Sequence, residues 1–207
     1  MTAALVSMVR KDHGVKQMDL INTDTSWRPA EWSKSQKTAT RNDIEFSIGK
    51  CALGKVLVAR SPVGVCAILM SSDAQELKRN LADRFPDRRL VSNERGLRDD
   101  MSKVVRFIET PSEGLALPLD MRHGTPFQRR VWDALRTIPC GAIITYAALA
   151  RRIGKPKAAR AVASACTANA IAMGIPCHRV VLSNGTLSGY RWGIERKRAL
   201  ISREAME

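Results

Sequence analysis

The chain has 207 residues, 44% of them hydrophobic, and its 34 basic and 20 acidic residues give a net charge of +14. This length suits one large domain or two small ones, with enough apolar residues for a core. No run of 18 apolar residues appears, so no membrane span is expected. The N-terminus has no signal-peptide pattern, and a cytoplasmic protein is the default. The five cysteines are scattered and never spaced as CxxC, which argues against a disulfide framework or a zinc ribbon.

The positive charge is concentrated in the C-terminal part of the chain. Residues 43–120 hold 12 basic and 12 acidic residues, whereas residues 121–207 hold 15 basic and 4 acidic residues, a net charge of +11. A basic half beside a neutral half favours a surface for a polyanion, most often a nucleic acid. The alternative is a basic surface that serves only solubility.

The first 42 residues show no sustained period and read as a flexible or irregular arm, which Trp27 and Trp32 could dock onto the body. The next part predicts an antiparallel meander of three strands and then two helices. The strands are expected at 44–48, 56–59 and 65–70, and the helices at 73–85 and 99–108. Asp73 is the expected N-cap of the first helix. No nucleophile–base pair stands out here, so this part reads as a scaffold.

A connection rich in proline, serine and glycine follows at residues 111–118, and the pattern then becomes helical. Helices are expected from Thr125 to Ile138, from Tyr146 to Ile153, and from about Pro156 to about Asn169. Their spacing is typical of a helix-turn-helix. Three cations at the head of the third helix oppose the helix dipole, and a phosphate partner would explain them. These cations are Lys155, Lys157 and Arg160.

One segment contains a candidate reactive cysteine beside basic residues: Pro176-Cys177-His178-Arg179-Val180. A thiol reacts as its thiolate, and neighbouring positive charge favours that form. The alternative is a buried structural cysteine, which is the commoner case on composition alone. A closing helix from Ile194 to Ala205 carries Glu204 near its end, and a solvated acid is the alternative for that residue.

This motif resembles the active site of the O6-alkylguanine-DNA alkyltransferases, the methylated-DNA–protein-cysteine methyltransferases. The resemblance covers about residues 43–207 and leaves the first 42 residues outside. Besides the cysteine motif, it rests on several further segments. They are Thr137 to Gly141, Tyr146, Gly154 to Val162, Asn169, and Gly185 to Gly193.

The resemblance implies a two-part fold of α/β plus mostly α class. Residues 43–120 would form a small ribonuclease-H-like scaffold domain, and residues 121–207 a winged-helix domain that binds DNA and carries the active site. It implies that the helix-turn-helix enters the minor groove of double-stranded DNA. It also implies a monomer that needs no cofactor and no metal.

The resemblance also assigns the chemistry. Cys177 would attack the alkyl carbon of O6-alkylguanine, and of O4-alkylthymine, in a stoichiometric and irreversible transfer. His178 would act as the base through a water, because neighbours in an extended chain point to opposite faces. Glu204 would orient His178, in the general logic of nucleophile, base and orienting group.

The remaining roles concern DNA and the base. Arg160 would enter the base stack in place of the flipped nucleotide, and Tyr146 would crowd the 3′ phosphate and donate to the base. Asn169 would tie the recognition helix to the active-site turn. Three residues would line the base pocket, one by its side chain and two by backbone groups. They are Tyr190, Val180 and Arg191.

Three other interpretations of the same residues stay open at this point. A winged-helix regulator would need Cys177 only for packing. A thiol hydrolase would use Cys177 and His178 and would turn over. A zinc site through these two residues is the weakest, because adjacent ligands without a second pair do not make a structural site.

Overall fold

The computed structural model describes residues 43–206, so the predicted arm with Trp27 and Trp32 lies outside the described residues. The predicted meander is confirmed: β1 (Ile44–Cys51), β2 (Gly54–Arg60) and β3 (Val65–Ser71) pair antiparallel. The sequence interpretation missed β4 (Leu90–Ser92), which pairs parallel with β1 and makes the order β3-β2-β1-β4. Three residues are too few to show a strand period, so only the tertiary pairing identifies them.

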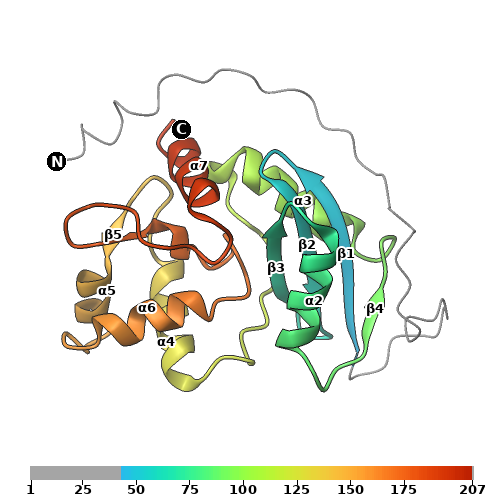
Figure 1. The fold of residues 1–207 in the computed structure, drawn as a ribbon, viewed down its shortest axis with the longest axis horizontal. Coiled ribbons are helices and arrows are strands. Elements are labelled where there is room, and N and C mark those ends of the chain that lie inside the picture. The colour runs from blue at the N-terminus through green and yellow to red at the C-terminus, as the bar shows by residue number, and fades with distance from the viewer. Residues whose placement is uncertain (1–42, 207) are drawn as a thin grey trace.

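Two helices pack against this sheet, as predicted. Helix α2 (Ala74–Arg84) contacts β3, and helix α3 (Arg98–Glu109) contacts β1. The Asp73 carboxylate accepts from the backbone N–H groups of Gln75 and Glu76, at 2.9 and 3.2 Å, and thereby caps α2. Figure 1 shows α2 crossing in front of the sheet. None of the predicted site residues lies in this half of the molecule.

The second half consists mainly of helices, and a long and mostly irregular segment connects the last two of them (Figure 1). After the short 3-10 helix η1 (Pro111–Glu113), the elements are α4 (Pro126–Arg136), β5 (Ile144–Thr145), α5 (Tyr146–Arg152), α6 (Ala159–Thr167), the 3-10 helix η2 (Cys177–Arg179), β6 (Val180–Val181) and α7 (Ile194–Glu204). Thr125 and Gln128 form a capping box at the start of α4, and the Thr145 hydroxyl caps α5.

Helix α6 begins later than the sequence indicated. Gly154 adopts a φ of +72°, and the chain turns through residues 154–158 before the helix starts at Ala159. Lys155 and Lys157 therefore lie on the turn before α6, and only Arg160 lies in its first turn.

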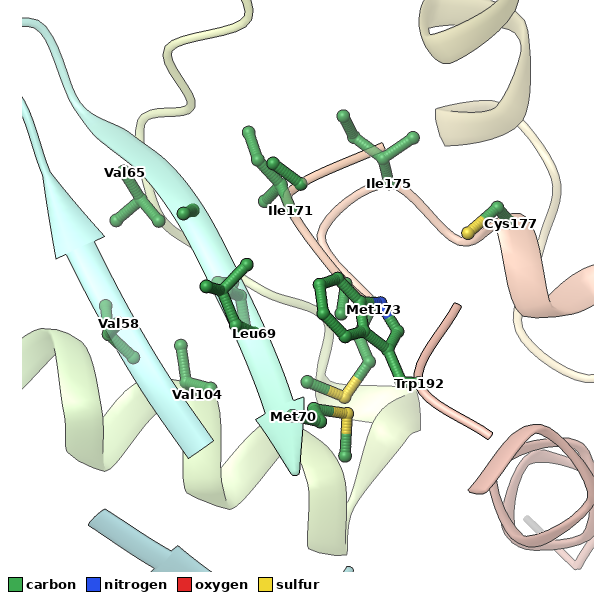
Figure 2. Close-up of a cluster of buried hydrophobic side chains, with 14 of the residues drawn as sticks. Val58, Val65, Leu69, Met70, Val104, Ile171, Met173, Ile175, Cys177 and Trp192 are labelled. Carbon is green, nitrogen blue, oxygen red and sulfur yellow. The ribbon is translucent and has the colours of Figure 1, made fainter. Parts of the chain in front are cut away.

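The two halves meet at the free edge of β3. Ile68 donates to the Ala170 carbonyl at 2.9 Å and accepts from the Ala172 N–H at 3.0 Å, so residues 170–172 extend the sheet edge. Figure 2 shows Ile171, Ile175 and Met173 packed beside β3, with Cys177 further along the same segment. The reactive turn is thus anchored to the sheet by the residues just before it.

The apolar core continues across this junction from the sheet into the helices. Trp132 of α4 is fully buried, and its indole N–H donates to the Ala165 carbonyl of α6 at 2.8 Å. Among residues 43–206, no helix is long and apolar enough to cross a membrane.

Candidate active site

The candidate site is built around the 3-10 turn Cys177–Arg179. The sequence interpretation assumed an extended chain here, and that assumption is wrong. The turn buries all three residues and hydrogen-bonds the Val180 N–H to the Cys177 carbonyl. It follows Pro176, which restricts the backbone entering the turn. His178 and Arg179 are therefore both directed into the protein.

Glu204 at the end of α7 meets both side chains. His178 Nε2 lies 2.8 Å from one carboxylate oxygen, and Arg179 donates to the two oxygens through Nε and Nη2 at 2.9 and 2.8 Å. The Gly141 N–H adds a longer contact at 3.4 Å. Burial by itself would raise the pKa of Glu204, but the hydrogen bonds from His178 and Arg179 outweigh it and lower the pKa to about 2.

An ionised Glu204 determines the proton positions on His178. A carboxylate only accepts, so Nε2 carries the ring proton and Nδ1 keeps its lone pair. Nδ1 is buried and has no hydrogen-bond partner among the described residues. Burial lowers the pKa of His178 more than Glu204 raises it, so the ring is neutral at pH 7. The residue therefore presents a neutral base with a free ring nitrogen.

Cys177 is buried, with 5% of its surface exposed. Burial is the largest effect and raises the pKa of the thiol, while a hydrogen bond from Asn169 and the positive charge of Lys197 act in the opposite direction. The Asn169 amide donates to Sγ at 3.2 Å and to the Ile175 carbonyl at 2.9 Å. The thiol is thus held in place, and it needs a base to ionise at neutral pH.

Known proteins resemble this chain in sequence and in fold. Residues 126–206 match the family described as "6-O-methylguanine DNA methyltransferase, DNA binding domain". The O6-methylguanine methyltransferase of Mycobacterium tuberculosis superimposes with a TM-score of 0.63 and 33% identity, over 79% of this chain and 93% of that one. This chain belongs to the O6-methylguanine-DNA methyltransferase family.

Curated members of the family match over a shorter share of their length. The bifunctional transcriptional activator/DNA repair enzyme Ada of Escherichia coli K12 is 49% identical over 162 residues, 78% of this chain and 46% of Ada. A methylated-DNA–protein-cysteine methyltransferase of Salmonella typhimurium is 56% identical over 81 residues, 39% of this chain and 47% of that protein. The chain therefore spans about half the length of the curated relatives it matches.

A solved complex also matches. The Mycobacterium tuberculosis OGT structure with DNA has a TM-score of 0.64 and 31% identity, over 78% of this chain and 93% of that one.

The structure brings together the three predicted catalytic residues and Asn169. Cys177, His178 and Glu204 lie in one buried cluster with Asn169. The Tyr190 hydroxyl is buried without a partner among the described residues, and burial raises its pKa well above 10, with the charge of Cys177 acting in the same direction.

Two of the predicted pocket residues, Val180 and Arg191, already form hydrogen bonds within the protein. The Val180 carbonyl accepts from Lys197 at 2.6 Å, which leaves it one lone pair for another donor. The Arg191 side chain lies over the Trp192 ring, 5.2 Å from the centroid, and donates to the Thr167 carbonyl at 3.4 Å.

The remaining predicted residues do not join the buried cluster. Lys155, Lys157 and Arg160 are exposed, on the turn before α6 and in its first turn. Tyr146 is half-buried at the start of α5, and its hydroxyl lies 2.6 Å from the Ser188 hydroxyl. Within residues 43–206, no three potential metal ligands gather in a cluster.

Lys197 is a functional candidate that the sequence interpretation missed. Its side chain is fully buried, and Nζ donates to the Val180 carbonyl and to the Ser188 hydroxyl at 2.6 and 2.8 Å. Ser188 in turn contacts Tyr146, so one ammonium joins the reactive turn, the following loop and helix α5. Burial lowers the pKa of Lys197, and the charge of Cys177 opposes that change.

A signal for Lys197 was present in the sequence. The buried residues of α7 are Lys197, Leu200 and Glu204, which share one helical face at spacings of three and four. A lysine in register with an apolar residue and a predicted site residue indicates a buried role. No comparable local signal identifies Arg179, because its pairing with Glu204 spans 25 residues and depends on the tertiary fold.

Proposed function

We propose that this chain repairs DNA by direct reversal, transferring the alkyl group of O6-alkylguanine, and of O4-alkylthymine, irreversibly to Cys177. The observation that carries the proposal is the buried contact between Glu204 and His178. His178 directly follows Cys177 in the same turn. A carboxylate that fixes the tautomer of a neutral imidazole creates a base at its other nitrogen. Burial raises the pKa of the Cys177 thiol, so its ionisation at neutral pH requires a base.

The reaction begins with removal of the thiol proton. His178 Nδ1 takes the proton of Cys177 through one water, and Glu204 stabilises the imidazolium that forms. The thiolate then attacks the alkyl carbon. The S–C bond forms as the C–O6 bond breaks, and the electron pair leaves with the guanine. The Tyr146 hydroxyl donates a proton to the departing base.

The product explains why transfer is stoichiometric. A thioether has no good leaving group, so no second step restores the thiol of Cys177. Each protein molecule therefore accepts one alkyl group and is then spent. This distinguishes the proposed chemistry from a thiol hydrolase, whose acyl-enzyme is released by water and which turns over.

The proposed partner is double-stranded DNA entered through its minor groove by a monomer. The exposed face of α6 carries small side chains beside Arg160, which suits a groove about 6 Å wide. Arg160 would fill the stack after base flipping, which costs a few kcal/mol. Lys155 and Lys157, on the exposed turn before α6, would contact backbone phosphates.

We assign the finer fold accordingly. Residues 43–120 form a ribonuclease-H-like domain, supported by the mixed sheet with α2 and α3. Residues 121–207 form a winged helix-turn-helix domain, supported by contacts of α6 with both α4 and α5. The backbone near Cys177, Val180 and Arg191, with Tyr190, would line the base pocket.

Intact mass spectrometry tests the proposal. The protein is mixed with excess duplex containing one O6-methylguanine, and we expect a gain of one methyl group per molecule, located on Cys177 by peptide mapping. Cys177→Ser should take up none while still binding duplex. Continued release of methyl product would favour the hydrolase, and unchanged activity of Cys177→Ser would favour the regulator. Either result would overturn the proposal.

A further inference from the structure

A shallow hollow of about 420 Å³ lies beside the C-terminal half of α6. Its lining residues are Ala163, Ser164, Thr167, Ala168 and Arg191. Four of the five have small side chains, and the fifth, Arg191, contributes a guanidinium group. The C-terminal end of α6 is turned toward the sheet half of the molecule (Figure 1). An occupant of this hollow would therefore lie where the two halves meet.

A second guanidinium reaches the same end of α6 from the sheet half. Arg84, the last residue of α2, donates to the Ala168 carbonyl, and Arg191 donates to the adjacent Thr167 carbonyl. Neither arginine forms an ion pair with any carboxylate of residues 43–206. Two positive groups from different parts of the chain thus converge without an acidic partner.

The two guanidinium groups repel each other, and the attraction of the α6 C-terminus for cations offsets only part of this repulsion. The carbonyls at a helix C-terminus attract cations, which accounts for one arginine on α6. A second one nearby adds repulsion: burial lowers the pKa of Arg84, and the charge of Arg191 lowers it further. An anion in the hollow would relieve that repulsion. Arg191 uses one of its five N–H donors on Thr167 and has others for such an anion.

The position along α6 identifies the anion. Lys157, a proposed phosphate contact, lies on the turn before α6, and Thr167 beside the hollow is the last residue of α6, about 12 Å along the axis from its start. Ala161 and Ser164 lie between them and are exposed. A helix face with small residues in its middle and cations at both ends matches a groove bordered by phosphates on either side.

We propose that Arg191, supported by Arg84, binds one backbone phosphate of the DNA in this hollow. The inference rests on the proposed function, because it takes α6 as the DNA-facing helix. It assigns a phosphate contact to the Arg191 side chain, beyond the backbone role at the base pocket. It also gives the sheet half a part in DNA binding, since Arg84 belongs to α2.

Salt-dependent binding of undamaged duplex tests the contact. Each phosphate contact contributes about 0.9 to the slope of log Kobs against log salt. We expect Arg191→Gln to make the slope shallower by about 0.9, while the glutamine amide can still donate to the Thr167 carbonyl. The matched control is Arg198→Gln, an exposed arginine of α7 that pairs with Glu195, and its slope should equal that of the wild type.

A methylphosphonate scan locates the phosphate. Each phosphate in turn is replaced by a neutral methylphosphonate, and we expect one position to weaken binding of the wild type but not of Arg191→Gln. Equal slopes for the two proteins, or the same loss at every position in both, would overturn the inference. Methyl uptake by the wild type is measured separately, so failure of the proposed function and failure of this contact give different results.

Discussion

Replacing Glu204 by glutamine isolates the electrostatic role of the buried carboxylate. The substitution keeps the size of the side chain but removes the charge that His178 and Arg179 share. Glu204 has a pKa of about 2 against an ordinary 4.5, a difference that corresponds to about 3 kcal/mol of stabilisation. Removing one partner of a buried ion pair costs about 3–5 kcal/mol, because the other charge remains buried. We expect Glu204→Gln to lower the free energy of unfolding by about 3 kcal/mol at pH 7.

The pH dependence provides the sharper readout. A carboxylate with a lowered pKa contributes its full stabilisation above pH 4.5, and loses it progressively as the pH falls from 4.5 to about 2. Urea unfolding is therefore measured for both proteins between pH 7 and pH 3. The difference between wild type and Glu204→Gln should be largest at pH 7 and should shrink as the solution is acidified.

The control is Glu195→Gln, which removes an exposed carboxylate from the same helix. Exposed ion pairs contribute about 0–1 kcal/mol, so its unfolding free energy should stay close to that of the wild type. Methyl uptake should be slowed about 10²-fold or more by Glu204→Gln, because an unoriented base loses its contribution. A loss below 1 kcal/mol for Glu204→Gln, or a loss independent of pH, would refute the reasoning.

Three further predictions concern the surroundings of the thiol and the packing of α4. Lys197→Met removes a positive charge that lowers the pKa of Cys177. Alkylation of the thiol by iodomethane should therefore be about tenfold slower at pH 7, and the pH profile of its rate should move to higher pH. An unchanged profile would contradict this. Asn169→Ala leaves the buried Ile171 N–H without a partner and removes one of the two hydrogen bonds to the Ile175 carbonyl, so it should lower the unfolding free energy by about 2 kcal/mol in urea. In Gly124→Ala the new Cβ would lie 2.3 Å from the Trp132 ring, so we expect a loss of about 1–3 kcal/mol, and a wild-type urea midpoint would argue against it.

Much of the secondary structure could be predicted because its signals are local. The three strands of the meander show apolar residues in short runs between turn residues, and the capping signals at Asp73 and Thr125 lie next to the helices they start. Strand β4 and the turn before α6 could not be placed by period. Strand β4 is too short, and the turn before α6 starts at Gly154, which adopts a positive φ.

The sequence by itself determined the chemistry available to this protein: a thiol next to an imidazole, an acid near the end of the last helix, and a basic C-terminal half. These depend on residue type and order, which folding does not alter. The tertiary structure decided how the groups act. Folding turned Cys177–Arg179 into a 3-10 helix, buried it, and placed α7 so that Glu204 meets His178 and Lys197 faces the same cluster. Burial and distance set protonation, and both arise only when residues far apart in the sequence come into contact.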